Sequence, residues 1–352
     1  MIINEKRQFI PALNQEITTV TLQNRKHTQV TITNYGGIIM SIKTPDRRGN
    51  FAEIALGFDD VEDYLTEAYK NNCPYFGAAI GRYANRIKDG RFTLDGNAYK
   101  LACNNGSNSL HGGPGGFHQK VWQLTTFKEP KRTGVVLTLK SEDMEEGFPG
   151  NLEVKMTYTL TFDNELVIDY EATTDKKTVI NLTNHSYFNL SSMQHNVLDH
   201  LLVLYADNFT PKDEHDIPTG EIVSVNNSPM DFLLPHKIGE RISDVDGRGY
   251  DHNYVINGFE GELNIGARLV DESTGRSLEF YTTEPGFQVY SGNYLDGSYN
   301  RNEIPFKAHY GLCFEAQKFP DSPNKTNFPS AELMPGETYQ QTTVYKFGIA
   351  DI

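Results

Sequence analysis

The sequence has few of the residues that would indicate a disulfide framework or a metal site. Its three cysteines (Cys73, Cys103 and Cys313) are odd in number, scattered and without a CxxC spacing. We interpret them as reduced thiols, which favours a cytoplasmic protein and argues against disulfides and a zinc site. None of the ten histidines falls in an HxH, HxxxH or HExxH spacing, so we predict no metal.

Positive charge and long apolar runs are also scarce. Lys and Arg total 32 against 46 Asp and Glu, a formal net charge of -14, which argues against a nucleic-acid partner because phosphate binding needs a basic surface. No apolar run approaches the length of a membrane span, and the opening "MIINEKRQFI" is too charged for a signal peptide. We therefore predict no membrane association.

What the sequence does have is alternation of apolar and polar residues. In "NLEVKMTYTLTF" the apolar residues fall on every second position from Leu152 to Phe162, and after "DNE" the pattern resumes from Leu166 to Ala172, which predicts a β-hairpin. Similar alternation recurs in several other stretches (28–43, 91–101, 121–140, 265–291 and 308–317). One short helix is predicted in "DDVEDYLTEAYK", capped by Asp59 or Asp60. The sequence thus predicts a single all-β domain over residues 1–352, a large antiparallel β-sandwich with few short helices.

"NLTNHSYFNL" (181–190) reads as a strand with unusual contents. With Ile180, one face is apolar and typical of a core (Ile180, Leu182, Phe188 and Leu190). The other face carries a row of hydrogen-bonding side chains around one imidazole (Asn181, Thr183, His185, Tyr187 and Asn189). A solvent-facing strand would normally carry Lys, Glu and Thr instead.

"YGLCFEAQ" (310–317) places an acid in an apolar strand. Cys313, Glu315 and Gln317 share one face, and Glu315 is flanked by apolar neighbours. We expect Glu315 to be at least partly buried, which is costly for a carboxylate unless it is paired or neutralised. Functional carboxylates tolerate that cost more often than structural ones, so we favour a functional role.

Four other stretches are less specific when taken alone. In "GRYANRI" (81–87), Arg82 and Arg86 lie beside Asn85 and could equally be surface arginines. In "LHGGPGGFH" (110–118), glycines permit close approach of a ligand, but a turn with an incidental His111 is the simpler interpretation, and no GxSxG elbow accompanies it.

The remaining two stretches carry an acid and an amide. Asp251 in "YDHNYV" is most simply a turn residue. Gln288 and Tyr290 in "TTEPGFQVYSGN" share a strand face, where they would either bind a polar ligand or be half-exposed.

Taken together, these stretches resemble the aldose 1-epimerases, the galactose mutarotases. "GRYANRI", "LHGG", "NHSYFNL", "DHNY", "TTEPGFQVYSGN" and the pattern ExQxFPDSPNxxNFPS occur in that order over residues 81–330. The resemblance implies a large antiparallel β-sandwich, with Glu315 as catalytic base and His185 as catalytic acid. It assigns sugar-positioning roles to five further residues (Asn85, Arg86, His111, Asp251 and Gln288). Tyr83 and His118 depart from the family pattern, which bears on fine specificity.

The residue types suit that chemistry. Interconverting the anomers of a cyclic aldose needs one base near O1 and one acid near the ring oxygen. Nothing is oxidised and no new bond persists, so no cofactor is expected. The predicted partner is a monosaccharide, an aldohexose, bound by a monomer or homodimer. Galactose and glucose are not distinguished.

Three alternatives stay open at this point. A glycoside hydrolase would use Asp251 and Glu315 as its two carboxylates. A non-enzymatic sugar-binding domain would bind without exchanging anomers. A phosphosugar 1-epimerase of the same fold would need extra cationic groups, which Arg82 beside Arg86 could supply.

Overall fold

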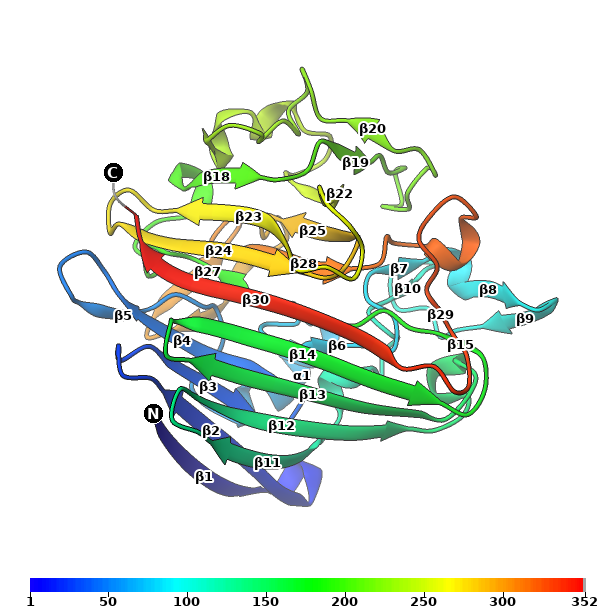
Figure 1. Ribbon diagram of the computed structural model, residues 1–352, viewed down its shortest axis with the longest axis horizontal. Helices are drawn as coiled ribbons and strands as arrows, with labels where there is room; N and C mark the ends of the chain where they lie inside the picture. The colour runs from blue at the N-terminus through cyan, green and yellow to red at the C-terminus, as the bar shows by residue number, and fades with distance from the viewer. Residues whose placement is uncertain (351–352) are drawn as a thin grey trace.

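The computed structural model describes residues 1–350, and antiparallel sheets dominate it. The largest sheet has nine strands, which follow in spatial order: β11 (Gln123–Lys128), β12 (Arg132–Ser141), β13 (Leu152–Thr161), β14 (Glu165–Thr174), β30 (Tyr339–Ile349), β24 (Arg276–Thr282), β23 (Asn264–Val270), β18 (Leu201–Leu204) and β21 (His236–Lys237). In Figure 1 this sheet faces the viewer, with β30 in red across its middle. Strand β30 pairs with β14 on one side and β24 on the other.

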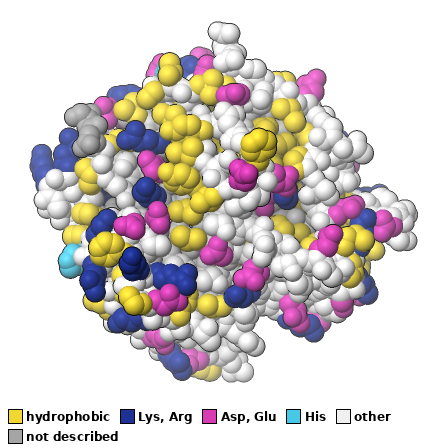
Figure 2. All heavy atoms as spheres, viewed as in Figure 1, with side chains coloured by type: hydrophobic (Ala, Val, Ile, Leu, Met, Phe, Trp, Pro, Cys, Tyr) yellow, Lys and Arg dark blue, Asp and Glu magenta, His cyan; other side chains and the backbone are white. Residues whose placement is uncertain are grey.

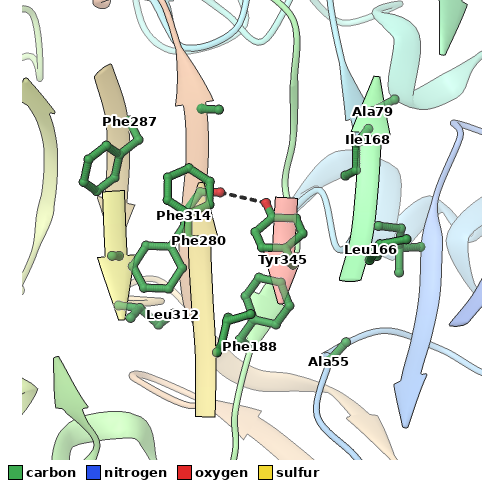
Figure 3. Packing of buried hydrophobic residues seen from close by; sticks show 14 of the residues in the cluster. Ala55, Ala79, Leu166, Ile168, Phe188, Phe280, Phe287, Leu312, Phe314 and Tyr345 are labelled. Atoms are coloured by element: carbon green, nitrogen blue, oxygen red, sulfur yellow. Dashed lines mark hydrogen bonds between the residues drawn. The ribbon is translucent and has the colours of Figure 1, made fainter. Parts of the chain in front are cut away.

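A six-stranded sheet lies behind part of the nine-stranded one. Its strands follow in spatial order: β17 (Tyr187–Phe188), β28 (Leu312–Gln317), β25 (Gly286–Tyr290), β22 (Asp251–Val255), β19 (Asn208–Thr210) and β20 (Val223–Ser224). The core between the two sheets is aromatic (Figure 3): the ring of Phe314 stacks on that of Phe280 with centroids 5.5 Å apart, and the Tyr345 hydroxyl donates to the Phe314 carbonyl at 2.9 Å. Two sheets packed face to face make a β-sandwich.

Strand β28 shows how this packing positions polar groups. Successive side chains of a strand point to opposite faces. Phe314 faces the aromatic core, so Cys313 and Glu315 point to the other side of the sheet, yet both remain buried. The alternation of the sequence therefore places an acid and a thiol on the inner wall of a second compartment.

The other elements are smaller. A five-stranded sheet comprises β1 (Ile2–Ile10), β2 (Gln15–Gln23), β3 (Gln29–Thr33), β4 (Ile39–Pro45) and β5 (Phe51–Glu53). Five two-stranded ladders are β6 (Ala79–Ile80) with β16 (Thr183–Asn184), β7 (Arg86–Ile87) with β10 (Ser109–Leu110), β8 (Arg91–Leu94) with β9 (Asn97–Lys100), β15 (Thr178–Val179) with β29 (Glu332–Leu333), and β26 (Asp296–Arg301) with β27 (Ile304–Lys307). Helical structure comprises α1 (Glu67–Asn71) and single 3₁₀ turns at Pro11–Leu13, Val61–Leu65, Lys88–Gly90, Phe117–Gln119, Glu145–Gly147, Val197–Asp199, Ile238–Glu240, Ile242–Asp244 and Ser322–Asn324.

The predicted antiparallel β-sandwich is confirmed, as is the hairpin at residues 152–172. Strands β13 and β14 pair from Leu152 opposite Thr174 to Leu160 opposite Leu166. Their alternate apolar side chains are buried, as the period of two requires.

The prediction of one continuous strand at residues 180–190 was wrong. The segment is broken into short pieces with different partners: Asn181 forms an isolated bridge with Tyr83, β16 pairs with β6, and β17 pairs with β28. Both of its predicted faces are buried, so the chain exchanges one long ladder for contacts on every side. A period of two reports which side chains share a face, but it does not report which strand is the partner.

The short helix predicted within residues 59–70 is confirmed, with Asp60 as its cap, but it is divided into two pieces. A 3₁₀ turn runs over Val61–Leu65 with Asp60 as its N-cap, and α1 begins anew after Thr66. Thr66 is extended (φ -63°, ψ 145°), and its hydroxyl accepts the N–H of Tyr69 as a second cap. Threonine favours such a capping position over a helix interior, because its hydroxyl competes for backbone groups.

Within residues 1–350, no helix has the length and apolar character needed to cross a bilayer. On the face seen in Figure 2, acidic and basic side chains lie interspersed.

Candidate functional site

A cavity of about 370 Å³ opens beside the six-stranded sheet. Its wall combines groups from loops, from β22 and β25, and from the second face of β28. Six of the seven residues predicted from the sequence line it: Asn85, Arg86, His111, His185, Asp251 and Glu315. The seventh, Gln288, is not among the residues that line the cavity, but it lies opposite Glu315 in the pairing of β25 with β28.

Glu315 is the most unusual of these groups. Its side chain is 2% exposed, and its Oε2 atom is buried without a hydrogen-bond partner among the described residues. Burial raises the pKa of Glu315 well above its ordinary value, the negative charge of Asp251 raises it further, and Arg86 opposes the rise. An unpaired buried carboxylate is costly, so this oxygen is available to accept a hydrogen bond from a ligand in the cavity.

His185 lies close to Glu315 in the wall of the same cavity. Its Nε2 atom lies 3.7 Å from Glu315 Oε2, and its backbone is fixed on both sides, donating to Ala78 O and accepting from Gly77 N. The imidazole lies nearly parallel to the rings of Tyr75 and Tyr187, with centroids 5.8 and 5.0 Å away. Burial lowers the pKa of His185 to about 4, although its own backbone carbonyl and Asp251 act to raise it. Aromatic faces favour a cation, so the two rings partly offset the cost of burying an imidazolium.

Asp251 is held in its ionised form on β22. Burial alone would raise its pKa, but the positive charges of Lys212 and Arg86 and a hydrogen bond from Gln288 lower it overall. Gln288 Nε2 donates to Asp251 Oδ1 at 2.7 Å, and Gln317 donates to Gln288 Oε1 at 3.2 Å. A chain of amides therefore orients one carboxylate toward the cavity.

The glycine-rich loop brings His111 into place. A Cβ on Gly112, whose φ is +84°, would lie 2.0 Å from the carbonyl oxygen of Gly81, so only glycine allows this close approach. The Asn85 N–H donates to His111 Nδ1 at 3.2 Å, and the His111 N–H donates to the Asn85 carbonyl at 3.1 Å. His111 lies in a turn, as expected when its stretch was taken alone, but it also lines the cavity, whereas Asp251 begins strand β22 and is not a turn residue.

Comparison with known proteins matches this architecture over almost the whole chain. A sequence profile of the aldose 1-epimerase family, described as "Aldose 1-epimerase", covers residues 18–346. The galactose mutarotase of Bos taurus is 44% identical over 324 residues, 92% of each chain, and the aldose 1-epimerase of Escherichia coli is 37% identical over 98% of this chain and 99% of that one. The chain belongs to the aldose 1-epimerase family. Among solved structures, galactose 1-epimerase from Lactobacillus acidophilus superposes with a TM-score of 0.86 at 27% identity, covering 99% of both chains.

Several residues in the cavity of this aldose 1-epimerase family member were not predicted from the sequence. Tyr75 and Asp216 lie on loops with positive φ values of 60° and 59°, and no pattern in their neighbourhood marks them. Asp216 Oδ2 accepts from Arg86 Nη2 at 3.0 Å and so fixes the guanidinium. Tyr187 and Cys313 were visible on polar strand faces but were given no role; both contact His185.

The site contains a cluster that resembles a metal centre. Ligand atoms of His111, His185 and Glu315 all lie within 4.8 Å of one another. A metal-bound imidazole, however, carries its proton on the other ring nitrogen and donates it to an acceptor. His111 Nδ1 instead accepts the Asn85 N–H, so Nε2 carries the proton and has no lone pair to offer. The hydrogen bonding of His111 therefore does not fit a metal.

Arg82 of the "GRYANRI" motif does not belong to the cavity. Its guanidinium is buried and donates to the Ser141 hydroxyl and to four backbone carbonyls (Ser141, Glu142, Phe148 and Pro149). All five of its N–H groups are thereby used. Arg82 therefore offers no charge to a sugar phosphate, which weakens the phosphosugar alternative.

Proposed function

We propose that this protein is a mutarotase that interconverts the α and β anomers of D-galactose, D-glucose or both, with Glu315 as base and His185 as acid. The observation that carries the proposal is the unpartnered Oε2 of Glu315, 3.7 Å from His185 Nε2, in a cavity rich in hydroxyl-binding groups. Family membership and the galactose mutarotases among the relatives support it.

The reaction divides between the two groups. Glu315 accepts the proton of the C1 hydroxyl while His185 delivers a proton to the ring oxygen, and the C1–O5 bond breaks to give the open-chain aldehyde. After rotation about the C1–C2 bond, the C5 hydroxyl attacks the other face of the carbonyl. His185 then takes back its proton, and Glu315 returns its own to O1. Asn85, Arg86, His111 and Asp251 hold the remaining hydroxyls, and Gln288 orients Asp251.

Burial of the pair assists the ring-opening step. The productive form has a carboxylate and an imidazolium, and proton transfer through the sugar converts both into neutral groups. Burial raises the pKa of Glu315 and lowers that of His185, so it disfavours the charged form of each. Ring opening therefore leaves the pair in the protonation state that its surroundings prefer.

The direct test is polarimetry of freshly dissolved α-D-galactose and α-D-glucose. We expect the approach to the equilibrium rotation to accelerate in proportion to protein concentration for at least one sugar. A protein that binds these sugars without accelerating the change would be a sugar-binding domain, and release of reducing sugar from a glycoside would indicate a hydrolase.

The pH profile should respond to Asp251. Its negative charge raises the pKa of both Glu315 and His185, so Asp251→Asn lowers both values. The pair acts with one shared proton, which gives a bell-shaped profile of kcat/KM. We expect the whole bell to move to lower pH in Asp251→Asn, whatever the change in KM.

Polarimetry between pH 4 and 9 measures the position of both limbs. The exposed Asp163, in the turn between β13 and β14, provides a matched control: Asp163→Asn should leave both limbs in place. An Asp251→Asn profile that stays fixed or moves to higher pH would contradict the assigned electrostatics. The other titratable groups around His185, unchanged in both variants, are His111, His118, Cys313, Tyr75, Tyr187 and Tyr290.

We further propose that the chain folds as one domain over residues 1–352 and acts in the cytoplasm as a monomer or homodimer. Residues from 85 to 315 in one cavity support the single domain, and the three free cysteines support the compartment.

A further inference from the structure

The site holds two histidines that differ in what surrounds their Nδ1 atoms. The rings of His111 and His185 have centroids 5.2 Å apart and meet edge to face. Both side chains are buried and both line the cavity. A neutral imidazole donates from one nitrogen and accepts at the other, and the neighbour of Nδ1 decides which nitrogen does which.

For His111 the neighbour of Nδ1 is a donor that cannot change its role. The Asn85 backbone N–H points at Nδ1 over 3.2 Å. Neutral His111 therefore carries its proton on Nε2. It offers the cavity a hydrogen-bond donor and has no lone pair there with which to take up a proton.

For His185 the neighbour of Nδ1 is the thiol of Cys313. The Sγ atom lies 3.6 Å from Nδ1, and Cys313 is two residues before Glu315 on the same face of β28. Burial, together with the charges of Glu315 and Asp251, keeps the pKa of Cys313 well above its ordinary value, so the sulfur stays a thiol. A thiol is both a weak donor and a weak acceptor, and in its accepting role the sulfur stabilises a proton on His185 Nδ1.

We propose that the site fixes its two histidines in opposite tautomers, and that Cys313 is the positioning residue that keeps the proton of His185 on Nδ1. This inference rests on the proposed function. Nε2 of His185, which faces Glu315, is then the only atom of that ring that exchanges a proton with the sugar. When the imidazolium gives its Nε2 proton to the ring oxygen, the neutral ring left behind already has the tautomer that the sulfur stabilises.

The proposal explains why two adjacent histidines have different tasks. His111 is a permanent donor to a sugar hydroxyl, because Nε2–H cannot accept. His185 is the proton carrier, because its Nε2 has a lone pair in the neutral state. The assignment follows from their hydrogen-bond partners and not from their position in the sequence.

Nitrogen NMR tests the tautomers without any activity measurement. In protein labelled with ¹⁵N-histidine, correlations from the ring carbon-bound protons to the two nitrogens distinguish the Nδ1–H from the Nε2–H form. The signals are assigned by their loss in His111→Asn and His185→Asn. We expect Nε2–H for His111 and Nδ1–H for His185 at neutral pH. The same tautomer in both rings would overturn the proposal, and it would do so whether or not the protein proves to be a mutarotase.

A matched pair of substitutions tests Cys313. Alanine and serine leave similar voids, but only serine retains an atom that accepts from Nδ1–H. We expect Cys313→Ala to lower kcat about tenfold with little change in KM, as removal of a partner that orients an imidazole does, and to mix the His185 tautomers in the NMR spectrum. Cys313→Ser should keep the Nδ1–H form and recover most of kcat. Equal kcat values for the two variants, with an unchanged His185 tautomer, would show that Cys313 only fills space.

Discussion

Glu315→Gln is expected to reduce mutarotation to barely above the uncatalysed rate while leaving sugar binding in place. Glutamine keeps the shape and the hydrogen-bonding ability of the side chain but lacks a basic carboxylate, so the C1 hydroxyl has no proton acceptor. The groups that hold the other hydroxyls are untouched. We expect galactose to bind in the millimolar range, roughly -4 kcal/mol, by calorimetry on the preparation used for polarimetry.

The same substitution should raise the thermal stability of the protein. A carboxyl whose folded-state pKa is raised contributes stability below its unfolded-state pKa, about 4.3, and loses it as the pH rises through the folded-state pKa. Burial raises the pKa of Glu315, so the wild-type protein is less stable at neutral pH than at pH 4 on account of this group, and the amide removes that loss. The difference in Tm between Glu315→Gln and wild type should therefore be larger at pH 7 than at pH 4.

Glu284 provides the matched control. It is another buried glutamate (2% exposed), but it lies outside the cavity and its Oε2 pairs with Lys318 Nζ at 3.2 Å. Burial raises the pKa of Glu284 as well, but Glu284→Gln also breaks an ion pair, so it should gain less stability than Glu315→Gln and should keep activity. A folded Glu315→Gln protein with the wild-type rate would show that the base lies elsewhere, with Asp251 as the next candidate.

His185→Asn is expected to lower the turnover rate by ~10²–10⁴-fold, the usual contribution of a general acid or base. Asparagine retains a hydrogen-bonding side chain but cannot deliver a proton to the ring oxygen, so much of the sugar binding should persist while kcat falls. Stopped-flow polarimetry gives kcat and KM across pH 5 to 8. Histidine His236, which pairs with Glu240 on the surface, serves as control, since His236→Asn should behave as wild type. A wild-type rate in His185→Asn across this range would remove His185 from the mechanism.

Much of the fold was predictable because alternation is a direct consequence of burying one face of a strand. Apolar residues occupy every second position from Leu152 to Leu160 and from Leu166 to Ala172, and these apolar side chains are buried. The segment around His185 was not predictable by the same reasoning. Its two faces are both buried against different strands, and only the complete chain determines which partners a short piece meets.

The candidate site shows the same division. Glu315 could be singled out because an acid between apolar neighbours signals a buried carboxylate. His111 and Asp251 could not be separated from turn residues by their own stretches, since their placement depends on the approach of the Gly112 loop to Gly81 and on the pairing of β22 with β25. Tyr75 reaches the cavity through a loop with positive φ, a conformation that its sequence does not announce. Family resemblance supplied what local chemistry could not.

The position of β30 has a consequence for biosynthesis. This strand lies in the middle of the nine-stranded sheet, between β14 and β24, yet it follows every other strand along the chain. The two halves of the sheet can form hairpins while the ribosome is still at work, but they have unpaired edges until residues 339–349 emerge. A nascent chain that stalls before that point therefore exposes two unpaired and aggregation-prone strand edges, β14 and β24. The sheet is complete only when the last strand has been made.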